Sequence, residues 1–162
     1  LETSAPFRFS AVSAGDVNND GYDDVLLGIP AADVVETDDK GATVNLSRAG
    51  EVRLYLGSAE GLSQNADWTA TGSQNGGLFG SAISSVGDLN GDGFDDILIG
   101  AYVADPGGNA DAGESYVIYG GPARAASVSL AGAGVTLSWV AVRDLSWGTG
   151  GGAGRGRGWR AA

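Results

Sequence analysis

The stretch that decides the fold is VGDLNGDGFDDILIG at residues 86–100, which repeats the earlier AGDVNNDGYDDVLLG at residues 14–28. In each copy, closely spaced acidic residues and a glycine run directly into aliphatic residues. The copies align with a shift of 72 residues, which brings Asp16 onto Asp88. Repetition of this kind is the sequence signature of architectures built from similar structural units. The phrase therefore marks a unit that the chain contains twice.

The match between the two copies extends beyond the acidic phrase. The flanking blocks are FSAVSAGD (9–16) on FGSAISSVGD (79–88), VLLGIPAAD (25–33) on ILIGAYVAD (97–105), and AGEVRLYLGSAEGLS (49–63) on AGESYVIYGGPARAA (112–126). Because all the blocks recur in the same order, a chance motif is excluded. We expect residues 1–72 to form the first unit and residues 73–137 the second.

Each unit reads as a series of short β-strands. The expected strands are residues 11–14, 24–29, 51–57 and 66–72 in the first unit and 82–86, 96–101 and 114–120 in the second, with residues 128–137 as a candidate outer strand of the second. Short apolar runs bounded by Gly, Asp, Asn and Pro are typical of strands, and no stretch has sustained helical periodicity. The sequence predicts an all-β fold with about four antiparallel strands per unit. The polar segments 30–50 and 105–113 are expected to be surface loops.

The acidic phrase has the composition of a cation-binding loop. Side chains with oxygen atoms stand at positions 1, 3, 5 and 9 of the phrase, and glycine at position 6 permits a sharp turn. Ca²⁺ takes about six to eight oxygen ligands, and Mg²⁺ prefers fewer protein ligands. The sequence therefore predicts two Ca²⁺ sites. The candidate side-chain ligands are Asp16, Asn18, Asp20 and Asp24 in the first loop and Asp88, Asn90, Asp92 and Asp96 in the second, and Tyr22 and Phe94 at position 7 would add their backbone carbonyls.

Other interpretations of the loop are weaker. An EF-hand needs a glutamate at position 12 and flanking helices, but Leu27 and Ile99 occupy that position inside apolar stretches. A single copy could be only a hairpin turn. Two copies with identical ligand positions favour a cation, because clustered carboxylates repel one another when nothing compensates them. Asp23 and Asp95, at position 8, are expected to face solvent or to cap the turn.

The amino-acid composition excludes several classes of function for this chain. The chain has no cysteine and no histidine, which excludes thiolate metal sites and His-dependent nucleophilic catalysis. Residues 1–122 carry 19 acidic and 4 basic side chains, so their net charge is −15, whereas residues 123–162 have a net charge of +4. An acidic body argues against nucleic acid as a partner. No apolar run approaches the roughly 20 residues that a transmembrane helix requires.

The sequence from Phe79-Gly80 through VGDLNGDGFDDILIGA resembles the FG-GAP repeat of integrin α-subunit β-propellers, and the likeness covers roughly residues 7–137. The first copy has Phe9-Ser10 in place of Phe-Gly, and Gly28-Ile29-Pro30 in place of Gly-Ala-Pro. The resemblance implies one four-stranded antiparallel propeller blade per repeat and Ca²⁺ in each acidic loop. It also implies adhesion or protein recognition outside the cell. The weak Ca²⁺ affinity that is usual for extracellular modules, together with the acidic body and the absence of cysteine, favours a bacterial extracellular or cell-surface location.

Two repeats are fewer than a closed propeller needs, because propellers typically have about four to eight blades. A third repeat would begin near residue 145, where the sequence is rich in Gly and Arg. We therefore expect a fragment of a longer propeller whose partners are further blades or a protein ligand, or self-association through open blade edges. Residues 138–162 are expected to be a disordered tail.

No catalytic constellation emerges from the sequence, so the prediction is a non-catalytic binding module. A carboxylate pair can hydrolyse glycosides, but the clustered carboxylates are assigned to the cation loops. The alternative is that the chain is an accessory propeller portion of a secreted hydrolase, such as a phospholipase, whose catalytic domain lies elsewhere.

Overall fold

The computed structural model describes residues 9–37, 40–122 and 126–129, and the fold that they form is all-β, as predicted. The first repeat contributes four strands to one sheet, whose order is β1-β2-β5-β6-β10. Its strands are β1 (Ser10–Gly15), β2 (Asp24–Ile29), β5 (Glu51–Tyr55), β6 (Trp68–Thr71) and β10 (Ala126–Ser129). The first four strands pair antiparallel in chain order. In β2 and β5 buried and less buried residues alternate, because successive side chains of a strand point to opposite faces.

The second repeat forms a separate antiparallel sheet in the order β7-β8-β9. Its strands are β7 (Ala82–Gly87), β8 (Asp96–Ala101) and β9 (Glu114–Ile118). The first strand pair of each repeat has the same register shift, between Ser13 and Gly15 and between Ser85 and Gly87. Such bulges redirect a strand locally, and each of these lies directly before an acidic loop. The two repeats thus share an irregularity of the backbone at the same place.

The segment 30–50, expected to be a loop, contains a small two-stranded sheet of β3 (Val34–Thr37) and β4 (Thr43–Leu46). Its β-branched residues, including Val34, Val35, Thr43 and Val44, favour extended backbone on both sides of a polar turn. In the second repeat the corresponding segment holds one 3₁₀ turn, Pro106–Gly108.

Of the predicted outer strand of the second repeat, residues 128–137, the structure describes only 128 and 129. Ala126–Ser129 form β10, which pairs in parallel with β6 of the first sheet and so adds to an edge that offers free backbone groups. The second sheet therefore has three strands among the residues that the structure describes, where four were expected. Residues 130–137 and the tail at 138–162 lie outside the described residues.

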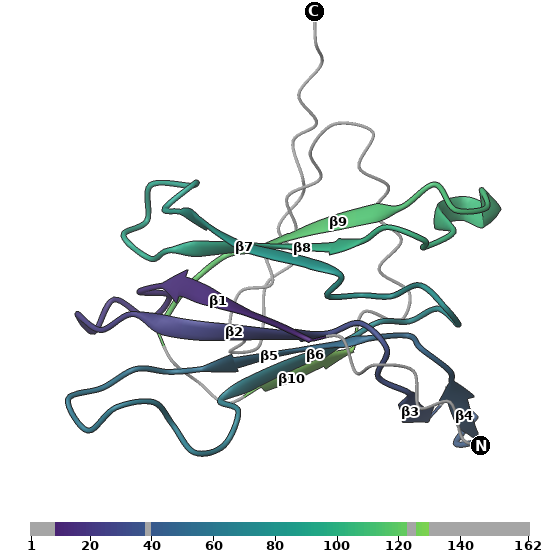
Figure 1. Cartoon of the computed structure of the whole chain (residues 1–162), viewed down its shortest axis with the longest axis horizontal. Coiled ribbons are helices and arrows are strands. Elements are labelled where there is room, and N and C mark those ends of the chain that lie inside the picture. The colour runs from purple at the N-terminus through teal and green to yellow at the C-terminus, as the bar shows by residue number, and fades with distance from the viewer. Residues whose placement is uncertain (1–8, 38–39, 123–125, 130–162) are drawn as a thin grey trace, which may run out of the picture.

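The two sheets lie over one another as layers and share one hydrophobic core (Figure 1). The core contains Leu26 and Leu54 of the first repeat together with Ile97 and Ile99 of the second. Phe79 is 1% exposed, and its ring meets Tyr116 edge to face with the centroids 5.4 Å apart. The start of the second repeat is thereby fixed inside the core shared by both.

Candidate cation-binding loops

The acidic loops connect β1 to β2 and β7 to β8, and their first carboxylate organises the turn. Asp16 Oδ1 accepts a hydrogen bond from the backbone N–H of Asp20 at 2.9 Å, and Oδ2 accepts one from Gly21 at 2.8 Å. In the second loop Asp88 does the same with Asp92 at 3.0 Å and Gly93 at 2.8 Å. In both repeats the carboxylate at position 1 therefore accepts hydrogen bonds from the backbone N–H groups of positions 5 and 6, and these bonds shape the turn.

Positions 3 and 5 are joined to each other. Asn18 Nδ2 donates to Asp20 Oδ2 at 2.8 Å, and Asp20 Oδ1 accepts from the backbone N–H of Tyr22 at 3.0 Å. The second loop repeats both contacts at the same distances, from Asn90 to Asp92 and from Phe94 to Asp92. The structure thus brings the predicted side chains of positions 1, 3 and 5 onto one short turn.

Position 9 has a structural role that the spacing did not predict. Asp24 is fully buried, and its carboxylate accepts from Val17 N at 2.9 Å and from Gly57 N, just after β5, at 2.8 Å. Burial raises the pKa of Asp24; the hydrogen bonds from Gly57 and Val17 oppose this effect, and the charges of Asp20 and Asp16 add to it. A nearby cation would favour the charged form of this buried group.

Asp96 occupies the same place in the second repeat. It is also fully buried and accepts from Leu89 N at 2.8 Å and from Gly120 N, just after β9, at 2.9 Å. The carboxylate at position 9 therefore ties the acidic loop to the end of the third strand in both repeats.

The loops fit a hard cation in their donor chemistry. Each carboxylate oxygen can accept more than one contact, so an oxygen that holds a backbone N–H retains capacity for a metal. Within the described ranges, however, no three His, Cys, Asp or Glu side chains are grouped so as to hold an ion. The ligand set, including the carbonyls of Tyr22 and Phe94, therefore stays a prediction.

The carboxylates at position 8 differ between the repeats. Asp23 is exposed, as expected. Asp95 instead reaches the first repeat, where its Oδ2 accepts from Asp16 N at 3.0 Å, and its own N–H donates to the carbonyl of Asp16 at 3.1 Å. For Asp95 the expected solvent-facing orientation is wrong, and the backbone that it caps belongs to the other loop. The spacing of residues within one loop cannot predict a hydrogen bond to another loop.

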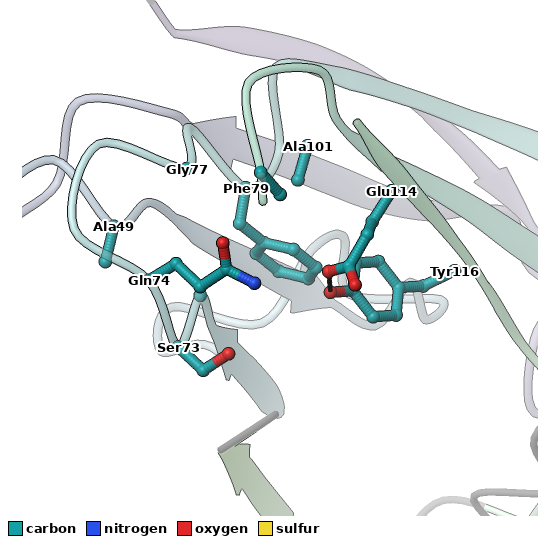
Figure 2. Close-up of a pocket in the computed structure, with 10 residues that line it drawn as sticks. Ala49, Ser73, Gln74, Gly77, Phe79, Ala101, Glu114 and Tyr116 are labelled. Atoms are coloured by element: carbon teal, nitrogen blue, oxygen red, sulfur yellow. Dashed lines mark hydrogen bonds between the residues drawn. The ribbon is translucent and has the colours of Figure 1, made fainter. Parts of the chain in front are cut away.

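A small hollow lies between the repeats, lined by Phe79, Gln74, Glu114 and Tyr116 among others (Figure 2). The hollow has room for about one water molecule. Glu114 is 5% exposed and accepts a hydrogen bond from the Tyr116 hydroxyl through Oε2, while its Oε1 has no partner. Burial, followed by the bond to Glu114, raises the pKa of Tyr116.

The two repeats coincide with matches to one family model, described as "FG-GAP repeat", at residues 9–55 and 79–118. Together these regions exceed half of the chain. The chain belongs to the FG-GAP repeat family. The resemblance inferred from Phe79-Gly80 and the acidic loops is thereby confirmed.

Similar proteins include integrin α subunits from animals. The chain is 36% identical to integrin alpha-5 of Xenopus laevis over 75% of its own length, 41% identical to integrin alpha-8 of Gallus gallus over 62%, and 38% identical to integrin alpha-IIb of Mus musculus over 66%. It spans only 11%, 9% and 10% of those proteins, respectively. The expected bacterial character of this FG-GAP chain finds no support in these relatives. In the portion of the chain that the structure describes, no helix has the length and apolarity to span a membrane.

Proposed function

We propose that this FG-GAP chain is a non-catalytic, Ca²⁺-stabilised β-propeller module for adhesion or protein recognition at or outside the cell surface. The observation that carries the proposal is the pair of matching loops, in which Asp16 and Asp88 organise the same turn at the same place in two repeats. A cation there would offset the repulsion among the acidic side chains of each loop.

Calcium would act structurally in this module. Each loop is fastened by Asp24 or Asp96 to the end of the third strand of its sheet. A cation held by the same carboxylate would stabilise the loop and both strand connections together. Extracellular calcium modules bind with dissociation constants of about 10⁻⁴ to 10⁻³ M, which favours a compartment with millimolar Ca²⁺.

A recognition role is supported by the character of the surface between the repeats. The hollow beside Glu114 has room for about one water molecule and is too small to enclose an organic substrate. The polar segments 30–50 and 105–113 instead follow the second strand of each sheet, and loops on a strand scaffold are where binding residues are commonly found. We propose that these segments contact a protein ligand.

Calorimetric titration of the full chain with Ca²⁺ tests the metal sites. We expect binding of two ions by the natural sequence, and none by the double variant Asp20→Ala with Asp92→Ala, because each substitution removes a carboxylate from the middle of one loop. Ca²⁺ at a hundred times its dissociation constant should stabilise the fold by about 2.7 kcal/mol per site. Thermal melting with Ca²⁺ and with a chelator measures this gain.

The variant Asp23→Ala is the matched control, since it removes an exposed carboxylate of the same loop that is not a predicted ligand. It should bind Ca²⁺ as the natural chain does. Absence of a heat of binding in the natural chain, or equal binding by the double variant, would contradict the assignment. Ca²⁺-dependent attachment of cells or extracellular proteins to the immobilised chain tests the recognition role separately.

A further inference from the structure

Beside the acidic loops, the second repeat docks on the first through three hydrogen bonds to the backbone of residues 16 and 17. Asp95 forms two of them, because its carboxylate accepts from Asp16 N and its N–H donates to Asp16 O. The third runs from Gly121 N to Val17 O at 2.8 Å. We name the side of a repeat that receives these contacts its trailing face, and the side that makes them its leading face. The trailing face of the first repeat comprises residues 14–17, and the leading face of the second comprises residues 94–95 and 120–121.

The trailing face of the second repeat has the same design but is exposed. Leu89 is equivalent to Val17, yet Leu89 is 56% exposed and Val17 only 3%. Val86 is equivalent to Ala14, and these residues are 38% and 0% exposed. The second repeat thus presents larger apolar side chains to solvent at the two positions that the first repeat buries.

The two repeats also have equivalent glycines in the trailing face, Gly15 and Gly87, and the space beside Gly87 is empty. A Cβ on Gly15 would collide with the carboxylate of Asp95, so glycine allows the second repeat to approach. The equivalent Gly87 has no atom within 4 Å of its would-be Cβ. The recess that receives Asp95 in the first repeat is therefore present and open in the second.

The leading face of the first repeat supplies the matching half. Asp23 is equivalent to Asp95 and is exposed, whereas Asp95 is partly buried by the first repeat. Ser58 is equivalent to Gly121 and is likewise exposed where Gly121 is buried. One chain therefore carries both halves of the contact that joins its own repeats, and both halves are exposed.

We propose that copies of this chain associate head to tail, with the leading face of one copy on the trailing face of the next. In this contact the Asp23 carboxylate accepts from Asp88 N of the neighbouring copy, Ser58 N donates to Leu89 O, and the Leu89 side chain is buried. The two surfaces are different, so the contact is heterologous and builds rings or open chains rather than a symmetric dimer. The proposal goes beyond the proposed function and does not require bound calcium.

Two complementary variants of the full chain test the arrangement. Leu89→Asp places a carboxylate in the trailing face, and Asp23→Arg removes the acceptor from the leading face. We expect the natural chain to gain mass with concentration in sedimentation equilibrium. Each variant alone should be monomeric, with a dissociation constant raised by more than about tenfold, because a charge would be buried without a partner. Circular dichroism establishes that both variants are folded.

Mixing the two variants distinguishes the proposed geometry from other kinds of association. The Leu89→Asp chain keeps a working leading face and the Asp23→Arg chain a working trailing face, so the mixture should form a heterodimer and nothing larger. The matched control Val35→Asp alters an exposed valine on the separate β3–β4 sheet and should leave self-association unchanged.

A crosslinking measurement avoids charged substitutions in the contact, since the natural chain has no cysteine. Ser58 contributes only its backbone N–H to the proposed contact, so a mixture of Ser58→Cys and Leu89→Cys chains should give a crosslinked heterodimer with a short bismaleimide, in preference to either homodimer. A natural chain that stays monomeric throughout, or a variant mixture that stays monomeric while the natural chain associates, overturns the proposal. The first result would favour a further blade of a longer chain as the cover of the trailing face.

Discussion

At the scale of single residues, the duplication lets each position be compared with its counterpart. Glu51 and Glu114 occupy the same position at the start of β5 and β9. Glu51 pairs with the guanidinium of Arg53, whereas Glu114 accepts from the neutral hydroxyl of Tyr116 and keeps one oxygen without a partner. The second repeat therefore buries a carboxylate with less compensation than the first.

We expect Tyr116→Phe to lower the free energy of unfolding by about 1–3 kcal/mol, because it leaves both oxygens of a buried carboxylate without a hydrogen-bond donor. The same substitution in a Glu114→Gln background should cost clearly less, since the group left behind is neutral. Urea denaturation of the four chains in this double-mutant cycle measures the difference. Equal losses in both backgrounds would show that the charge of Glu114 does not matter.

Individual residues could be predicted from the sequence where their role depends on local spacing. The turn made by Asp16, Asn18 and Asp20 follows from alternation within a few residues, and the structure brings these side chains together. Asp95 could not be placed in the same way, because its partner Asp16 is 79 positions away and belongs to another unit. The hollow beside Glu114 likewise depends on how two repeats pack.

At the scale of elements, the buried aspartates at position 9 act as connectors. Asp24 joins the loop before β2 to the end of β5, and Asp96 joins the loop before β8 to the end of β9. This role is independent of any metal, because the hydrogen bonds go directly to backbone N–H groups. It can therefore be measured when calcium is removed.

In the presence of a chelator, Asp24→Ala should destabilise the fold by about 2–4 kcal/mol, because it leaves the N–H groups of Val17 and Gly57 buried without acceptors. The exposed neighbour Asp23→Ala should cost much less under the same conditions. Thermal and chemical unfolding of both variants gives the comparison. If Asp24→Ala matters only when calcium is present, the connector role is wrong and metal binding alone accounts for this residue.

The strands of the repeats were predictable because short aliphatic runs bounded by turn residues leave few alternatives. β2 and β8 occupy the expected ranges, Asp24–Ile29 and Asp96–Ala101. The β3–β4 sheet was not predicted. The polar residues around Lys40 indicated a loop, although β-branched residues stand on either side of them. The position of β10 was missed because a strand can add to either open sheet edge, and local sequence does not choose between them.

At the scale of the whole molecule, the sheets are held together by close backbone approach as well as by the shared core. Phe79 N donates to Ala49 O at 2.9 Å, and Gly50 forms a parallel bridge with Phe79. A Cβ on Gly50 would collide with the backbone of Phe79. The phenylalanine that opens the second repeat therefore depends on a glycine in the first.

Substitution of this glycine should separate the repeats. Gly50 has φ +93° and Gly41 has φ +81°, but the would-be Cβ of Gly41 has no atom within 4 Å. Gly41→Ala should therefore show the cost of positive φ alone, about 1–3 kcal/mol, whereas Gly50→Ala adds a backbone collision between the sheets and should cost distinctly more. Hydrogen exchange gives the second readout, because the amides of β8 should lose protection relative to those of β2 in Gly50→Ala only. Equal losses of stability and protection in the two variants would mean that the repeats do not rely on this approach, and that the apolar core alone holds the sheets together.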